Sequence, residues 1–159
     1  MTRDEFAALL GRFTAKVEAG DGAGFAQLFV ADGEYHDVFY GAFKGRAGIA
    51  DMLVNYFWRD AEAFRWETTE PASDGETGYA RWHFSFASKL PQVAGKRVYM
   101  EGVGYFKLRD GLIARYEDYA RAGECLVQLG HAPERLHRIF EKMAERQNAT
   151  AEAQRHLAG

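Results

Sequence analysis

Two adjacent carboxylates, Glu117 and Asp118, lie near the end of the apolar segment GLIARYEDYA. The segment begins in a turn sequence, RDG, and its pattern predicts a β-strand. Successive side chains of a strand point to opposite faces of the sheet, so only one of the two acids can face the core. A carboxylate in an apolar pocket is desolvated, which raises its pKa and makes it a better base near neutral pH. The alternation of residues alone does not decide which acid this is.

Three further side chains could join such a carboxylate. Asp37 lies in the segment EYHD, and Arg81 and His83 lie two residues apart in TGYARWHFSFAS. Histidine exchanges protons near neutral pH, and arginine can stabilise a negative charge that develops during a reaction. Each also has a structural interpretation: Asp37 as a turn residue, Arg81 as an ion-pair partner and His83 as a hydrogen-bonded core residue. Asp118 could equally form a salt bridge at the end of its strand.

The elements that must position these residues follow from hydrophobic spacing and turn signals. Thr2 and Glu5 predict a capping box for a first helix that ends at Gly20. A short second helix follows Asp21, and a third carries the apolar stripe Ile49, Met52, Leu53, Tyr56 and Phe57. The other segments predict strands at 34–40, 64–70, 77–88, 96–108 and 112–120, and a final helix from Pro133.

This order predicts an α+β domain in which helices lie on one side of a strongly bent antiparallel sheet. We expect residues 1–148 to form a single domain and residues 149–159 to form a polar tail or frayed helix. The segment GECLVQLG, which contains Cys125, is predicted to be a loop that covers the mouth of a pocket.

The composition argues against several classes of protein. The chain has 159 residues and a net charge of −3 without a Lys/Arg cluster, so we expect no nucleic-acid partner. We expect no signal peptide, and no apolar run reaches the roughly 20 residues that a membrane span requires. Because Cys125 is the single cysteine, a reducing, cytoplasmic location is expected. The histidines lack metal-ligand spacing, and no glycine-rich phosphate loop is present, so we expect no metal and no nucleotide.

The two faces of the segment 78–88 can be interpreted in two ways. One face carries Ala80, Trp82, Phe84 and Phe86, and the other carries Tyr79, Arg81, His83 and Ser85. Either the aromatic face packs on the helices and the polar face meets water, or the polar face lines a pocket and the aromatic face meets a second subunit. Since the last strand also lacks a clean solvent face, we expect a homodimer through the outer face of the sheet.

The segments LFVADGEYHD, GAFKGRAGI and FKLRDGLIARYEDY together resemble the nuclear transport factor 2-like superfamily. Within it, the chain is most similar to the group of SnoaL-like polyketide cyclases, limonene epoxide hydrolases and ketosteroid isomerases, over residues 4–120. The resemblance implies a cone-shaped, cystatin-like α+β barrel with a deep pocket and no cofactor, here with an extra C-terminal helix.

The resemblance also implies roles for individual residues. Asp118 matches a catalytic aspartate of the cyclases and epoxide hydrolases, and Asp37 matches the general base of the isomerases. Tyr35 with Asp37 matches a Tyr-x-Asn pair of the hydrolases, and Arg81 with His83 matches their Arg-x-Asp. These matches place Tyr35, Asp37, Arg81, His83 and Asp118 on the inner face and turn Glu117 outward.

Several positions depart from the family patterns. Phe13 stands where the isomerases have the tyrosine of their oxyanion hole, and only Glu101 lies near the position of the second donor. His83 replaces an aspartate of the hydrolases, and Asp37 replaces their asparagine. These departures argue against ketosteroid isomerisation and against plain epoxide hydrolysis.

We therefore expect a cofactor-independent acid/base enzyme that isomerises, cyclises, dehydrates or cleaves a hydrophobic aromatic or polycyclic small molecule. Asp118 or Asp37 would remove a proton, His83 would deliver one, and Arg81 and Tyr35 would hold the developing negative charge. The expected substrate-binding residues are Phe13, Phe57, Trp66, Tyr99 and Glu101. The alternatives are a formaldehyde-releasing lyase for lignin-derived aryl dimers, an epoxide hydrolase, a non-catalytic binding protein and a dimerisation module.

Overall fold

The N-terminal helices cover one side of the sheet in the computed structural model, which describes residues 1–158. Helix α1 (Arg3–Glu18) begins with the predicted capping box: the Thr2 hydroxyl accepts from the Glu5 N–H at 3.2 Å, and the Glu5 carboxylate accepts from the Thr2 N–H at 2.7 Å. Helix α2 (Gly22–Ala26) is capped by Asp21. The next helical segment is continuous and consists of α3 (Gly45–Met52), the π-helical turn η1 (Leu53–Phe57) and α4 (Trp58–Asp60).

Six strands form one sheet in the order β2-β1-β6-β5-β4-β3. Their bounds are β1 (Phe29–Asp37), β2 (Gly41–Lys44), β3 (Ala61–Ser73), β4 (Thr77–Ser88), β5 (Arg97–Arg109) and β6 (Leu112–Ala120). The predicted α+β class with a curled sheet around N-terminal helices is confirmed, and so are the predicted bounds of β4 and β6. One pairing was not expected: β1 and β6 run parallel, whereas the other neighbours are antiparallel.

The parallel pairing sets the position of the two aspartates. Tyr35 lies opposite Tyr116, and His36 lies opposite Glu117. Asp37 and Asp118 are the next residues of the two strands, so the same register brings them side by side on the face that carries the two tyrosines. Glu117 points to the other face, as the resemblance implied.

The aromatic residues of β4 face the helices. Ala80, Trp82 and Phe84 are buried in the main core together with the apolar face of α1. Gly102 and Gly104 of β5 make room for large rings on this face, because a Cβ on Gly102 would lie 2.6 Å from the Trp82 ring and one on Gly104 would lie 2.8 Å from the Tyr116 ring. The alternative in which the aromatic face of β4 meets another subunit is therefore wrong.

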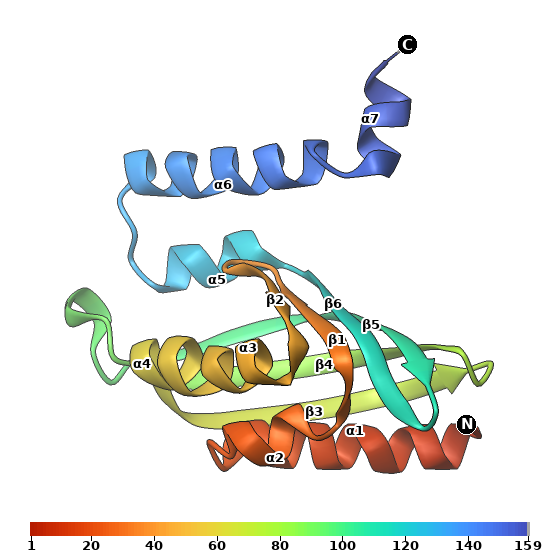
Figure 1. Ribbon diagram of the computed structural model, residues 1–159. Coiled ribbons are helices and arrows are strands. Elements are labelled where there is room, and N and C mark those ends of the chain that lie inside the picture. Colours follow the sequence, from red (N-terminus) through yellow and green to blue (C-terminus); the bar gives the residue numbers. More distant parts are fainter. Residues whose placement is uncertain (159) are drawn as a thin grey trace.

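Within residues 1–158, three helices follow the sheet: α5 (Ala122–Gln128), α6 (Pro133–Asn148) and α7 (Ala151–Leu157). The segment predicted to be a loop around Cys125 is helix α5, which buries Cys125 and Leu126. A 3₁₀ turn, η2 (Pro91–Val93), lies between β4 and β5. Figure 1 shows α6 on the far side of α5 from the sheet. No helix within residues 1–158 is long and apolar enough to cross a membrane.

Candidate active site

A cavity of about 340 Å³ lies between the inner face of the sheet, the end of the α3–α4 segment and the C-terminal helices. Its walls are largely apolar and come from β3, β4, β5, α5 and α6. The apolar side chains that line it include Phe57, Phe64, Trp66, Trp82, Phe84, Phe86, Met100, Leu126 and Ile139. The polar side chains that line it are Tyr35, Asp37, Tyr40, Arg59, Asp60, Asp118, His131 and Arg135.

Asp37 is the last residue of β1, and its carboxylate organises the turn that follows. Oδ1 of Asp37 accepts hydrogen bonds from the backbone N–H groups of Phe39 and Tyr40, each at 2.7 Å. These bonds explain why the strand ends at residue 37 rather than at residue 40 as predicted, because both amides turn back to the carboxylate. Oδ2 of Asp37 makes no hydrogen bond to the residues that the structure describes.

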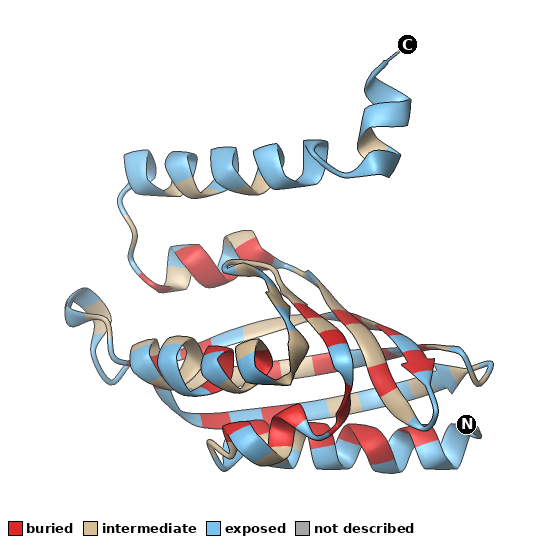
Figure 2. Cartoon of the chain, viewed as in Figure 1, coloured by how far each residue is buried: buried red, intermediate tan, exposed pale blue. Residues whose placement is uncertain are grey.

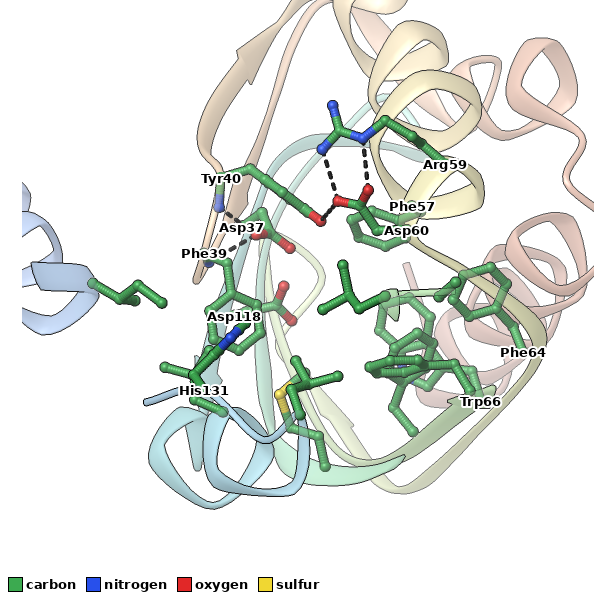
Figure 3. Close-up of a pocket in the computed structure, with 18 of the residues that line it drawn as sticks. Asp37, Phe39, Tyr40, Phe57, Arg59, Asp60, Phe64, Trp66, Asp118 and His131 are labelled. Atoms are coloured by element: carbon green, nitrogen blue, oxygen red, sulfur yellow. Dashed lines mark hydrogen bonds and ion pairs between the residues drawn. The ribbon is translucent and has the colours of Figure 1, made fainter. Parts of the chain in front are cut away.

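Asp118 is held by two tyrosines of the inner face. The Tyr35 hydroxyl donates to Oδ2 of Asp118 at 3.4 Å, and the Tyr116 hydroxyl donates to Oδ1. The two phenol rings pack against each other with centroids 4.7 Å apart, and both rings are buried. Their position fixes the Asp118 carboxyl beside Asp37 (Figure 3).

The two carboxyls have unequal affinities for protons. Burial raises the pKa of Asp37 to about 6, against the two backbone hydrogen bonds and the charge of Arg146, which lower it. Burial, and after it the charge of Asp37, raises the pKa of Asp118 well above its ordinary value, although the tyrosine hydroxyls oppose this. Asp118 therefore holds its proton more tightly than Asp37 does. Two carboxyls of unequal proton affinity lie side by side in an apolar cavity.

A second polar group lies next to the carboxyl pair, on the side of Asp37 (Figure 3). The Tyr40 hydroxyl donates to Oδ2 of Asp60 at 2.8 Å, and the Arg59 guanidinium donates to both oxygens of Asp60 at 2.7 Å. Because Asp60 is paired with Arg59, this group carries no net charge. His131, between α5 and α6, also lines the cavity, and partial burial lowers its pKa.

Five of the predicted site residues line the cavity: Tyr35, Asp37, Phe57, Trp66 and Asp118. The expectation that Arg81 and His83 join them is wrong. Since Trp82 and Phe84 are buried inside, strand alternation turns Arg81 and His83 to the outer face.

The outer face carries its own polar cluster. Arg81 lies 3.9 Å from the Glu70 carboxylate, and His83 Nδ1 lies 2.7 Å from the Tyr99 hydroxyl. Tyr99 in turn donates to Glu101 at 2.9 Å. Tyr99 and Glu101, predicted to bind substrate, thus face away from the cavity. Phe13 is a core residue behind Tyr35 rather than a wall residue, with the two rings stacked at 6.3 Å.

Six polar residues of the site were not predicted, and two of them are Arg59 and Arg135, which line the cavity from α4 and α6. Tyr116 shares the parity of Asp118 on β6, so strand alternation could have identified it. Tyr40, Asp60 and His131 lie outside the predicted inner face, in a turn, at a helix end and in a connection between helices, and no local pattern marks them. Within residues 1–158, no three His, Cys, Asp or Glu side chains gather as ligands of a metal ion would.

Comparison with known proteins identifies the fold. The model of a family described as a SnoaL-like domain matches residues 10–116, and no curated protein sequence matches the chain. The chain is similar to a protein of Catenulispora acidiphila that has a ketosteroid isomerase-like fold and was crystallised with trimethylamine. The two chains are 19% identical with a TM-score of 0.70, and the match covers 78% of this chain and 93% of that one.

Two further structures have the same fold. A candidate polyketide cyclase of Xanthomonas campestris pv. campestris is 21% identical with a TM-score of 0.66, covering 79% of this chain and 97% of that one. An LEH-like epoxide hydrolase of M. tuberculosis is 18% identical with a TM-score of 0.64, covering 80% of this chain and 90% of that one. The predicted resemblance to the cyclase, epoxide hydrolase and isomerase group is confirmed.

Proposed function

Because the chain belongs to the SnoaL-like domain family, we propose that it is a cofactor-independent acid/base enzyme for a small hydrophobic aromatic compound. The observation that carries this proposal is the pair of neighbouring carboxyls with unequal proton affinity, Asp37 and Asp118, in an aromatic cavity. The names of the similar structures, which include a cyclase and an epoxide hydrolase, support the class of reaction.

In this proposal Asp37 is the general base. Its Oδ2 carries the free lone pairs, while Oδ1 is held by the turn, so the carboxylate is fixed as it removes a proton from an acidic carbon of the substrate. Asp118 is the general acid: it donates its proton to the substrate oxygen on which negative charge develops. Tyr35 and Tyr116 stay protonated, because burial raises the pKa of each, and they orient the Asp118 carboxyl.

The cavity also limits the substrate. Its volume of about 340 Å³ is near the lower end of the range for small-molecule pockets, which favours a compound of one or two rings over a larger polycycle. The long apolar wall of β3 and β4 would cover the rings. The substrate oxygen would lie at the opposite end of the cavity, against the carboxyl pair.

The test is hydrogen exchange at an acidic carbon of a two-ring ketone. 2-Tetralone would be incubated with the protein in D2O, and loss of the proton signal at the carbon between carbonyl and ring followed by NMR. We expect the protein to accelerate exchange, and Asp37→Asn to reduce the acceleration about 10²- to 10⁴-fold, as is typical for loss of a general base. If the wild-type protein and Asp37→Asn exchange the ketone at the rate of buffer, proton abstraction is refuted. Ligand binding without exchange, detected by saturation-transfer NMR, would instead favour a binding protein.

We also propose that the protein is a homodimer through the outer face of the sheet. Four large side chains of that face are exposed: Tyr79, Tyr99, Val103 and Tyr119. They come from β4, β5 and β6, which are adjacent in the sheet. Light scattering should give twice the chain mass, and Val103→Asp should give the monomer mass. A monomeric wild-type protein at micromolar concentration would refute the dimer.

A further inference from the structure

Helix α6 approaches the turn after β1 with one face. Leu136, Ile139 and Met143 are half-buried and recur at helical spacing. Arg146 follows three residues later and continues the same face. Since α6 contains no fully buried residue, few groups fix its position (Figure 2). Its Arg135 and Ile139 nevertheless line the cavity, so the position of α6 matters to the site.

The Arg146 guanidinium binds the turn between β1 and β2. Nη1 donates to the carbonyl oxygen of Phe39 at 2.9 Å, and Nη2 donates to that of Val38 at 3.1 Å. Gly41 leaves room for this contact, because a Cβ at that position would lie 3.1 Å from Nη1. Two parallel donors from a planar group fix the turn in orientation as well as in position.

The same turn holds the Asp37 carboxylate from the other side. The N–H groups of Phe39 and Tyr40 point to Oδ1 of Asp37, while the carbonyls of Val38 and Phe39 point to Arg146. Both peptide groups of the turn are thus held on two sides: Asp37 accepts from their N–H groups, and Arg146 donates to their carbonyl oxygens. Loss of Arg146 would free the carbonyls and allow the two N–H donors to move away from the carboxylate.

We propose that Arg146 is a positioning residue that docks α6 on the turn 38–40 and thereby holds two backbone N–H donors on the Asp37 carboxylate. The proposal rests on the proposed function only in that Asp37 is the base. It links the C-terminal helix to the reacting carboxylate through the backbone, without contact between Arg146 and the substrate.

The charges around Asp37 agree with this role. Arg146 is a cation that lowers the pKa of Asp37, in the same direction as the N–H donors that it positions. The other titratable groups that face Asp37 come from β1, the turn, β6 and α5, and they are Tyr35, Tyr40, Tyr116, Asp118 and Cys125. None of these groups is a cation. Arg59, which is paired with Asp60, and Arg135 line the same cavity, but the cation that lowers the pKa of Asp37 is Arg146.

The test compares Arg146→Gln, Arg146→Lys and a control, Arg138→Gln, without any substrate. Arg138 is exposed on the outward side of the same helix, so its replacement removes the same charge from α6. Two quantities would be measured by NMR: the titration of the Asp37 side-chain carbon, and hydrogen exchange of the Phe39 and Tyr40 amides. Circular dichroism would establish that each variant is folded.

We expect Arg146→Gln to raise the pKa of Asp37 by about half a unit or more and to speed exchange of both amides about tenfold. Arg146→Lys should keep the pKa of Asp37 close to its wild-type value, because the positive charge remains. It should restore little of the protection of the two amides from exchange, because a lysine lacks the planar pair of donors. Arg138→Gln should change neither quantity. The proposal would be overturned if the exchange rates of the Phe39 and Tyr40 amides were unchanged in Arg146→Gln, or if Arg138→Gln had an equal effect on them. Neither readout depends on turnover, so a failure of the proposed function would be seen separately.

Discussion

Replacing Asp37 with asparagine should make the folded protein more stable at neutral pH. The pKa of Asp37 is raised from 3.8 to about 6 in the folded state, so the folded protein binds this proton more tightly than the unfolded chain does. A group with a raised folded pKa favours folding fully below its unfolded pKa, and this contribution is lost as the pH rises through the folded pKa. The contribution of Asp37 to the free energy of unfolding is therefore lost between about pH 4 and about pH 6.

The magnitude follows from the shift. A rise from 3.8 to about 6 corresponds to about 3 kcal/mol of stability lost above about pH 6, at 1.36 kcal/mol for each unit. Asparagine keeps the oxygen that accepts from Phe39 and Tyr40 but cannot ionise. At pH 7 the variant should gain up to about 3 kcal/mol, or roughly 6–12 °C in melting temperature for a chain of this size. Near pH 3 the gain should vanish.

The assay is urea unfolding at a series of pH values, with Asp51→Asn as a control. Asp51 is exposed on α3, and its Oδ1 accepts a hydrogen bond from Asn55 that an asparagine can also accept. The difference in unfolding free energy between Asp37→Asn and wild type should grow as the pH rises from about pH 4 to about pH 6. A difference that is constant with pH would refute the claim that burial of the carboxylate perturbs Asp37.

Two other results are expected. The rate of 2-tetralone exchange should rise with pH through about pH 6 as Asp37 ionises and should fall at higher pH as Asp118 ionises. The Asp118→Asn variant should exchange the ketone more slowly, and its rate should not fall at higher pH. A rate that does not change with pH would contradict the assignment of base and acid. Gly102→Ala should destabilise the fold by about 1–3 kcal/mol, because the added Cβ would lie 2.4 Å from the Tyr119 carbonyl oxygen and 2.6 Å from the Trp82 ring. Gly11→Ala, where nothing lies within 4 Å, is the matched control in urea unfolding, and equal stabilities would contradict the close packing.

Much of the fold could be predicted from the sequence because its signals are local. The capping box, the apolar stripe of α1 and the alternation of β4 and β6 each depend on residues close in the chain. The parallel pairing of β1 with β6 has no such signal, since it joins segments that are separated by about half of the chain.

The site was predicted only in part, for a similar reason. Asp37, Asp118 and Tyr35 were placed correctly by the resemblance, whereas Arg81 and His83 were assigned the wrong face of β4. Hydrophobic alternation alone left the orientation of β4 open, and the large apolar contribution of Trp82 and Phe84 decides it in the structure. Arg146 lies in a helix that the resemblance does not cover, and no pattern in the sequence connects it with Asp37.

The pairing of β1 with β6 also bears on how the chain reaches its native state. Tyr35 and Asp118 are separated by 83 positions, so a long loop must close before their contact forms. Until β6 has been synthesised and has joined the sheet, Asp37 has no neighbouring acid. A chain without β6 can thus contain the helices α1–α4 and the hairpins β3–β4 and β4–β5 while it lacks the carboxyl pair. The proposed catalytic site is therefore expected to be among the last features to assemble.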